Sequence, residues 1–182
     1  RTTGWLQRMM RLFLLRVVLP RQWVLGIFVS GLRFYQQTKL MDIVRGSGIL
    51  RNFTPRLAGL EESAPVVSSG SFKAKGQIIP AQGVVSARVG LFSGCIMPLV
   101  HGPQMDTVTR VLARNGCEVV VIKDQICCGA ISSHVGDLEV ARQMARQNIE
   151  VFMASGVDAV VVASAGCGSR MKDYSDLLID DN

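Results

Sequence analysis

Four cysteines stand at positions where their thiols could share one site. Cys95, the doublet Cys127-Cys128 and Cys167 each follow a short apolar run that ends in a loop, and each stands next to a glycine. In two of these cases the cysteine comes five positions after the last apolar residue, from Ile122 to Cys127 and from Val162 to Cys167. Thiolates are ligands for zinc and for iron–sulfur clusters. The pattern therefore predicts a metal or redox site made of thiols.

Three chemistries compete for these cysteines. A disulfide between Cys127 and Cys128 would need strained local geometry, because the two residues are adjacent. A zinc site usually takes paired ligands with a short spacer, whereas 31 residues separate Cys95 from Cys127 and 38 separate Cys128 from Cys167. On a cluster with several irons, neighbouring cysteines can bind different irons. The doublet favours the iron–sulfur cluster, and structural zinc stays the alternative.

The elements that carry these cysteines read as parallel strands. Residues 88–92, 118–122 and 158–162 are short, rich in Val and Leu or Ile, and separated by helical patterns, as in a sheet buried on both faces. The carboxyl ends of parallel strands meet at one edge of a sheet, which is the usual ligand edge of an α/β fold. We therefore expect the four thiols to meet at that edge.

Helical patterns at residues 104–115, 137–155 and 169–178 follow the three strands. A short repeat supports this order. Gly116 and Gly156 are each followed two residues later by an acid, Glu118 or Asp158, and then by a Val-rich run. Glycine at that point suits the left-handed residue that closes a helix. The fold class we predict is α/β, a small parallel β-α-β-α-β-α sheet domain over residues 87–182.

Charge divides the chain near residue 86. Residues 1–86 hold twelve Lys and Arg against three Asp and Glu, a balance of +9, whereas residues 87–182 hold eight against eleven, a balance of −3. We predict a helical basic arm at 1–45 and a linker rich in Gly, Ser and Pro at 46–86. Because the chain begins at Arg1 and stops soon after a helical pattern, we expect it to be a piece of a longer protein.

The arm is hydrophobic and basic, with two helices expected on either side of Pro20 and four arginines on their polar side (Arg8, Arg11, Arg16 and Arg21). Its longest stretch without a charge is eleven residues, between Arg21 and Arg33, against the roughly 20 that a spanning helix needs. We expect the arm either to pack on the rest of the protein or to touch a membrane surface or a partner subunit. The aromatic residues do not alternate with basic ones, so no nucleic acid partner is expected.

At the cysteines the sequence resembles the cysteine-rich CCG domain family. The resemblance rests on Gly94-Cys95, on the string from Cys127 to Ala130 with Ser133-His134, and on the string from Ser164 to Gly168 with Lys172-Asp173-Tyr174. This domain occurs in iron–sulfur subunits of glycolate oxidase, in heterodisulfide reductase B subunits, in an anaerobic glycerol-3-phosphate dehydrogenase subunit and in a lactate-utilisation protein. The glycolate oxidase subunits are the most similar.

The resemblance implies an electron-transfer subunit of a flavin-dependent 2-hydroxy-acid dehydrogenase. A [4Fe–4S] cluster would be held by Cys95, Cys127, Cys128 and Cys167, with Gly129 and Gly168 beside it. FAD would reside on a flavoprotein partner, because no flavin fingerprint follows a strand here. The protein would then be cytoplasmic, as five cysteines without a signal peptide also suggest, or peripheral to the inner membrane through its arm.

Other residues carry weaker claims. His134 lies six residues past Cys128, close enough for proton transfer near a cluster, although a lone histidine is more often structural. Cys117 precedes its strand and is expected at the opposite edge of the sheet. Arg170 occupies the position where heterodisulfide reductases carry a fifth cysteine, which disfavours a thiol reductase-like activity. Besides that activity, a lactate-utilisation subunit or a metal-stabilised interaction module without catalysis stays an alternative.

Overall fold

The computed structural model describes residues 4–5, 9–10, 13–18, 21–48, 52 and 54–179. Within these residues a four-stranded sheet has the order β1-β3-β2-β4, where β1 is Ile78–Ile79, β2 Ala87–Phe92, β3 Cys117–Val121 and β4 Ala159–Val162. Strand β2 pairs in parallel with both β3 and β4. The predicted α/β fold is thereby confirmed, and β1 adds a short antiparallel edge strand that the sequence did not reveal.

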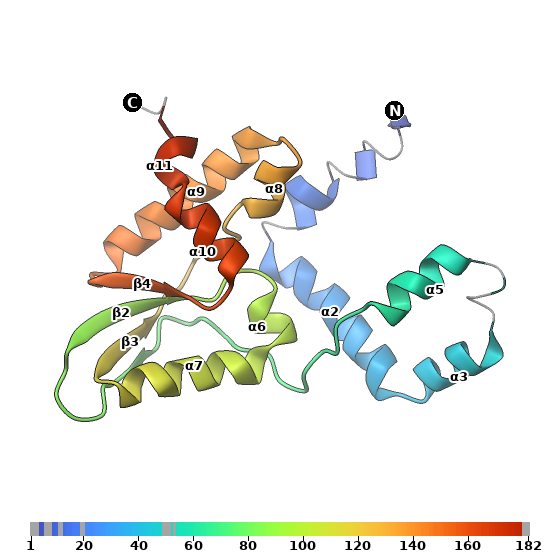
Figure 1. Ribbon diagram of the computed structural model, residues 1–182, viewed down its shortest axis with the longest axis horizontal. Coiled ribbons are helices and arrows are strands. Elements are labelled where there is room, and N and C mark those ends of the chain that lie inside the picture. Colours follow the sequence, from blue (N-terminus) through green and yellow to red (C-terminus); the bar gives the residue numbers. More distant parts are fainter. Residues whose placement is uncertain are drawn as a thin grey trace.

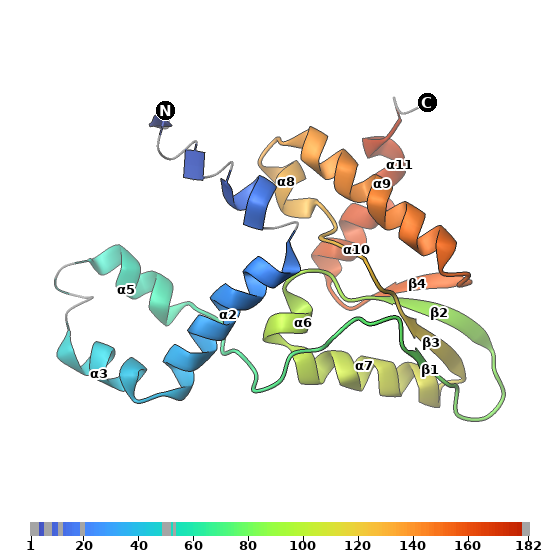
Figure 2. The ribbon, with the colours of Figure 1, turned by 180° about the vertical axis from the view of Figure 1, so that it is seen from behind.

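Helices cover both faces of this sheet, as Figures 1 and 2 show. Helix α7 (Gly102–Arg114) lies on one face, and α9 (Leu138–Ala154) lies on the other with α10 (Ala165–Lys172) and α11 (Tyr174–Leu177). Side chains of the two central strands form the core between them, because Leu91, Val119 and Val121 are fully buried. This double cover explains why the strands read as continuous apolar runs.

The expected helix closures are present. Gly116 and Gly156 have φ values of +80° and +61°, so each takes the left-handed conformation just before its strand. One expected helix differs, because residues 169–178 belong to two short helices, and α10 already begins at Ala165. Cys167 therefore lies in the first turn of α10 rather than in a loop before it.

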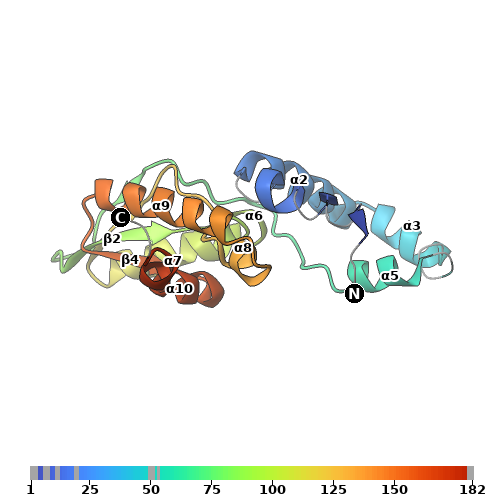
Figure 3. The ribbon, with the colours of Figure 1, turned by 90° about the horizontal axis from the view of Figure 1, so that it is seen from above.

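The described part of the arm contains the π-helix η1 (Leu14–Val18), α2 (Gln22–Gln37) and α3 (Leu40–Ser47). Pro20, Arg8 and Arg11 lie outside the described residues, so the expected break at Pro20 is not described. Helix α2 leaves the cysteine domain beside α6 (Met97–Val100), and α3 lies at its far end, giving the molecule the elongated outline of Figure 3. No helix in the described part of the chain is long and apolar enough to cross a membrane.

Part of the expected linker has structure of its own. Residues 46–86 contain α5 (Pro55–Glu62), which starts at a proline that suits the first turn of a helix, and strand β1. Between these two elements the chain runs along α6 and α7, where the Phe72 amide donates to the carbonyl of Pro98 at 2.8 Å. A Cβ on Gly102 would stand 2.4 Å from the carbonyl oxygen of Gly70, so only glycine allows this approach.

Candidate metal centre

The four predicted cysteines meet at the carboxyl edge of the sheet. Cys95 follows β2, Cys127 and Cys128 follow β3, and Cys167 stands in α10 after β4. The Sγ atoms of Cys95 and Cys127 are 3.5 Å apart. Cys95, Cys127 and Cys128 are buried, with 6%, 3% and 3% of their surface exposed, and Cys167 is partly buried. The parallel order of β2, β3 and β4 produces this convergence, and the role of the thiols as ligands stays a prediction.

The thiols form a chain of hydrogen bonds that runs from Cys95 to Cys127, Cys128 and Cys167. The hydrogen bond with Cys127 lowers the pKa of the Cys95 thiol, although burial opposes that shift. For Cys127 the hydrogen bond with Cys128 acts downward, but the bond with Cys95 and burial outweigh it and raise the pKa to about 12. Without metal, the Cys95 thiol therefore ionises more easily than the other three thiols, whose pKa values are raised.

The pKa values of Cys128 and Cys167 are raised as well. The pKa of Cys128 is raised, first by its hydrogen bond with Cys127 and then by burial, although its bond with Cys167 acts downward. The pKa of Cys167 is raised by its hydrogen bond with Cys128 and by burial. Binding of a metal by these thiols would therefore release protons.

Backbone amides at the start of α8 (Ala130–His134) donate to the doublet. The amide of Gly129 donates to the thiol of Cys127, and the amide of Ala130 donates to the thiol of Cys128. Gly129 reaches this arrangement with φ of +80°, and a Cβ on it would lie 3.3 Å from backbone atoms of Ala141 in α9. Amides aimed at sulfur stabilise thiolate charge.

Gln125 ties the Cys95 loop to the doublet loop. Its Oε1 atom accepts the amides of Ser93 at 2.7 Å and Gly94 at 3.3 Å. Its Nε2 group donates to the carbonyls of Leu91 at 3.4 Å and Ile122 at 2.5 Å. Because this amide is buried and bonded on both sides, the distance between the two loops depends on it.

Asn148 and Tyr174 hold the backbone of the doublet from behind. The Nδ2 group of Asn148 donates to the carbonyl of Cys127 at 3.1 Å, and its Oδ1 accepts the amide of Ile126 at 3.0 Å. The phenol of Tyr174 donates to the carbonyl of Cys128 at 3.0 Å, and the Asn148 amide donates to that phenol at 3.3 Å. Both side chains are buried, and burial raises the pKa of Tyr174. The carbonyls of the doublet are thereby held in one orientation.

Sequence reasoning missed these supporting residues, although one signal was visible. Asn148 continues the helical stripe of Ala141 and Ala145, which are completely buried, and a polar residue on an apolar face usually has a specific partner. Gln125 carried no comparable signal, because a loop glutamine is common on a surface. Tyr174 belonged to a string that carries the family resemblance, but no role was assigned to it.

The other predicted residues take different positions. His134 is exposed at the end of α8, and its part in proton transfer stays a prediction. Gly168 is helical, and a Cβ on it would meet only Val162, at an ordinary 3.9 Å. Cys117 pairs with Ala87 at the opposite end of β3, as expected. Arg170 donates from Nη1 to Ser133 Oγ at 3.0 Å and so joins α10 to α8.

The donor set fits an iron–sulfur cluster. Four thiols, three from loops and one from the first turn of α10, are the ligands that such clusters take. The hydroxyls of Ser93 and Ser132 lie within two and four residues of a cysteine, and both are buried without a hydrogen-bond partner among the described residues. A hydroxyl donor of that kind suits a sulfide or thiolate acceptor. Within the described residues, no three or more His, Cys, Asp or Glu side chains are arranged so that they could hold a metal ion.

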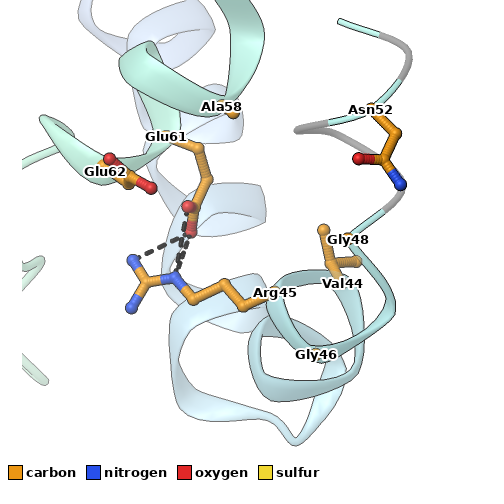
Figure 4. A pocket seen from close by; sticks show the side chains of 8 residues that line it. All are labelled: Val44, Arg45, Gly46, Gly48, Asn52, Ala58, Glu61 and Glu62. Carbon is orange, nitrogen blue, oxygen red and sulfur yellow. Dashed lines mark hydrogen bonds and ion pairs between the residues drawn. The ribbon is translucent and has the colours of Figure 1, made fainter. Parts of the chain in front are cut away.

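A separate hollow of about 600 Å³ lies between α3 and α5, far along the arm (Figure 4). Figure 4 shows the ion pair in it, where the Arg45 guanidinium lies 3.0 Å from the Glu61 carboxylate. None of the described residues that line this hollow is a cysteine or a histidine. Its ion pair fastens α5 onto α3, which is a structural role.

The cysteine domain and the arm each match the sequence model of a known protein family. The family model of the CCG cysteine-rich domain matches residues 89–172, and the linker region of glycolate oxidase iron–sulfur subunits matches residues 6–64. The chain is 35% identical to a probable glycolate oxidase iron–sulfur subunit of Bacillus subtilis over 96% of its length, and 31% identical to the glycolate oxidase iron–sulfur subunit of Escherichia coli over 52%. It is 36% identical to the lactate utilization protein A of Shouchella clausii over 51%.

The chain spans only part of each relative: 40% of the Bacillus protein, 24% of the Escherichia protein and 38% of the Shouchella protein. No solved structure matches it. The match to the Bacillus protein covers 96% of the chain, so the arm and the cysteine domain both have counterparts in that relative.

Proposed function

This chain belongs to the family of glycolate oxidase iron–sulfur subunits with a CCG cysteine-rich domain, and on that premise we propose that it transfers electrons within a 2-hydroxy-acid oxidising complex. One observation carries the proposal: four thiols that come from distant parts of the chain meet at one edge of the sheet. Their number, burial and hydrogen-bond donors suit a [4Fe–4S] cluster.

Cys95, Cys127, Cys128 and Cys167 would each bind one iron of this cluster. The bound cluster would accept and pass on one electron at a time. The amides of Gly129 and Ala130 would continue to donate to the ligand sulfurs and offset their negative charge. The buried side chains of Gln125, Asn148 and Tyr174 would keep the ligand loops in place during oxidation and reduction. Small reorganisation of the ligands favours electron transfer.

The substrate and the partner follow from the relatives' names and belong to the proposal. A flavoprotein partner carrying FAD would oxidise glycolate to glyoxylate, releasing two electrons and two protons. The electrons would pass singly through this subunit to an acceptor that takes both, such as a membrane quinone. The similarity to lactate utilization protein A favours lactate as the second candidate substrate. Turnover of the assembled complex with glycolate and with lactate separates the two.

The test of the cluster is chemical analysis of protein purified without oxygen. About four iron and four sulfide per chain, with an electron paramagnetic resonance signal after reduction, are the expected result. Zinc without sulfide would overturn the proposal and support an interaction module stabilised by metal. A cluster that could not be reduced would exclude the electron-transfer role. A thiol reductase-like activity is disfavoured, because Arg170 is engaged with Ser133 where a fifth cysteine would stand.

We place the partner contact on the arm. Four large side chains of α2 project with more than half of their surface exposed: Trp23, Ile27, Phe28 and Phe34. These side chains would form the surface that meets another subunit in the cytoplasm. Sedimentation with anionic vesicles tests the other occupant, a membrane surface, since binding there without the partner would assign this face to lipid.

A further inference from the structure

Gln22, in the first turn of α2, reaches from the arm to the backbone of two cysteine-bearing loops. Its Nε2 group donates to the carbonyl of Gly94 at 3.2 Å, next to Cys95. The same group lies 3.4 Å from the carbonyl of Gln125, two residues before Cys127. One amide of the arm therefore spans the two loops whose sulfur atoms are themselves in contact.

Neighbouring residues of the arm close the same side of the site. Leu25, one turn after Gln22, packs on the cluster of buried side chains that includes Cys95 and Cys127. Before α2, Leu15 and Val18 are buried, and the Arg16 guanidinium pairs with Asp137 at 3.1 Å. Apolar cover excludes water from thiols, and the ion pair fixes the arm to the start of α9.

The other side of the same loops is held from within the cysteine domain. Gln125 accepts hydrogen bonds from the amides of Ser93 and Gly94. Gln22 donates a hydrogen bond to the carbonyl of Gly94. The Cys95 loop is therefore bonded from two directions, by Gln125 in the loop after β3 and by Gln22 in the arm. Removing the arm's contact would leave the carbonyls of Gly94 and Gln125 without this donor and open a path to the sulfurs.

We infer that Gln22 is a positioning residue of the cysteine site, and that α2 is the cover that limits access to Cys95 and Cys127. Of the two experiments that test this inference, thiol labelling of the metal-free chain is independent of the proposed cluster, and only iron release from the loaded protein rests on it. It assigns to the arm a task inside the metal centre, in addition to any contact with a partner. Opening of α2 away from the loops would then control how fast solvent, chelators and oxidants reach the sulfurs.

The first test labels the thiols of the metal-free whole chain with a maleimide and identifies each site by mass spectrometry. In Gln22→Ala, Cys95 and Cys127 should react about 5- to 10-fold faster, the change expected when local opening loses one or two hydrogen bonds. Cys117, at the opposite end of β3, should react at the wild-type rate. Equal acceleration at Cys117 would indicate general destabilisation and overturn the inference, as would unchanged labelling of Cys95 and Cys127.

Two further variants separate the hydrogen bonds from packing. Gln22→Glu has nearly the same shape and favours the start of a helix, but its carboxylate donates nothing to the two carbonyls. It should accelerate labelling as Gln22→Ala does, and wild-type labelling would show that Gln22 acts by packing alone. Gln37→Ala, at an exposed position at the other end of α2, is the matched control and should leave both cysteines unchanged.

The second readout is the anaerobic release of iron to a chelator from the loaded protein. Gln22→Ala should load the wild-type amount and release it about 5- to 10-fold faster, by the same loss of hydrogen bonds. If the wild-type chain held no iron and sulfide, the proposed cluster would fail, and the labelling experiment would still decide the role of Gln22. A wild-type release rate in Gln22→Ala, with normal loading, would overturn only the role of Gln22.

Discussion

The phenol of Tyr174 donates to the carbonyl of Cys128 at 3.0 Å, across 46 positions of the chain. This bond connects α11, the last described helix, to the doublet that follows β3. The Asn148 amide joins the same network and continues it to the carbonyl of Cys127. The end of the domain thus supports the centre of the site.

Replacing Tyr174 with Phe should weaken the site while keeping the aromatic packing. The carbonyl of Cys128 would lose its buried donor, which costs about 1–3 kcal/mol of unfolding free energy. Urea unfolding of the metal-free chain measures this cost, and iron content measures the effect on the site. Tyr35→Phe removes a hydroxyl that donates to Glu61 of α5, away from the cysteines, so it should leave the iron content unchanged. Equal iron loss in both variants would contradict the role of Tyr174.

Gln125→Met should be more damaging. Methionine has a similar length but leaves the buried amides of Ser93 and Gly94 without an acceptor. The carbonyls of Leu91 and Ile122 also lose their donor, so we expect about 2–4 kcal/mol of destabilisation. Gln104→Met, at an exposed position of α7, is the control and should change the urea midpoint little. A midpoint of Gln125→Met as high as that of the control would argue against the amide link.

Gly129→Ala tests the conformation of the doublet loop. Alanine in the left-handed region costs roughly 1–2 kcal/mol, and here its Cβ would also press on the backbone of Ala141 at 3.3 Å. Gly136 is a matched control, since its φ of +82° is nearly the same and a Cβ there would meet nothing within 4 Å. Gly129→Ala should therefore unfold at lower urea than Gly136→Ala and hold less iron. Equal midpoints would show that the contact with Ala141 is harmless.

Serine substitutions distinguish ligands from the remaining cysteine. Cys95→Ser, Cys127→Ser, Cys128→Ser and Cys167→Ser should each bind iron at least about 10-fold more weakly, because even partners outside the ligand set cost that much in metal sites. Cys117→Ser should retain the wild-type iron and sulfide, since Cys117 stands at the other edge of the sheet. Full iron retention by any of the four variants would remove that cysteine from the ligand set.

The metal-free chain should lose stability in alkali. The pKa values of Cys127, Cys128 and Cys167 are raised by folding, so above the ordinary thiol pKa the unfolded chain ionises first and binds fewer protons. Stability that is complete below that pKa is then lost as the pH rises toward the pKa of Cys127, about 12. Cys95, whose pKa is lowered, acts in the opposite sense on its own.

The unfolding free energy falls by at most about 1.4 kcal/mol per pH unit for each thiol whose pKa is raised. Urea midpoints at about pH 7.5 and about pH 10.5, measured with a reductant, give the change, because that interval crosses the ordinary thiol pKa. Cys127→Ser should show a smaller alkaline decrease than the wild type. An unchanged wild-type midpoint across this interval would contradict the sharing of protons among the buried thiols.

Much of the fold followed from local pattern. The Val-rich runs predicted the three parallel strands, because strands buried on both faces must be apolar throughout. Gly116 and Gly156 predicted the helix closures, because the left-handed conformation is available to glycine at little cost. The convergence of the cysteines followed in turn, since parallel strands deliver their carboxyl ends to one edge.

Tertiary structure alone decided what holds those cysteines in place. Gln125, Asn148 and Tyr174 bond to loop backbone 21 to 46 positions away, and Gln22 bonds to Gly94 across 72 positions. Each is a polar residue whose partner is a main-chain group, and main-chain groups carry no mark in the sequence. The sequence by itself therefore predicted which thiols gather and at which edge of the sheet they do so, and their role as ligands stays a prediction. The packing of α2, α9 and α11 determined how firmly those atoms are held, because that depends on distances between segments that are far apart along the chain.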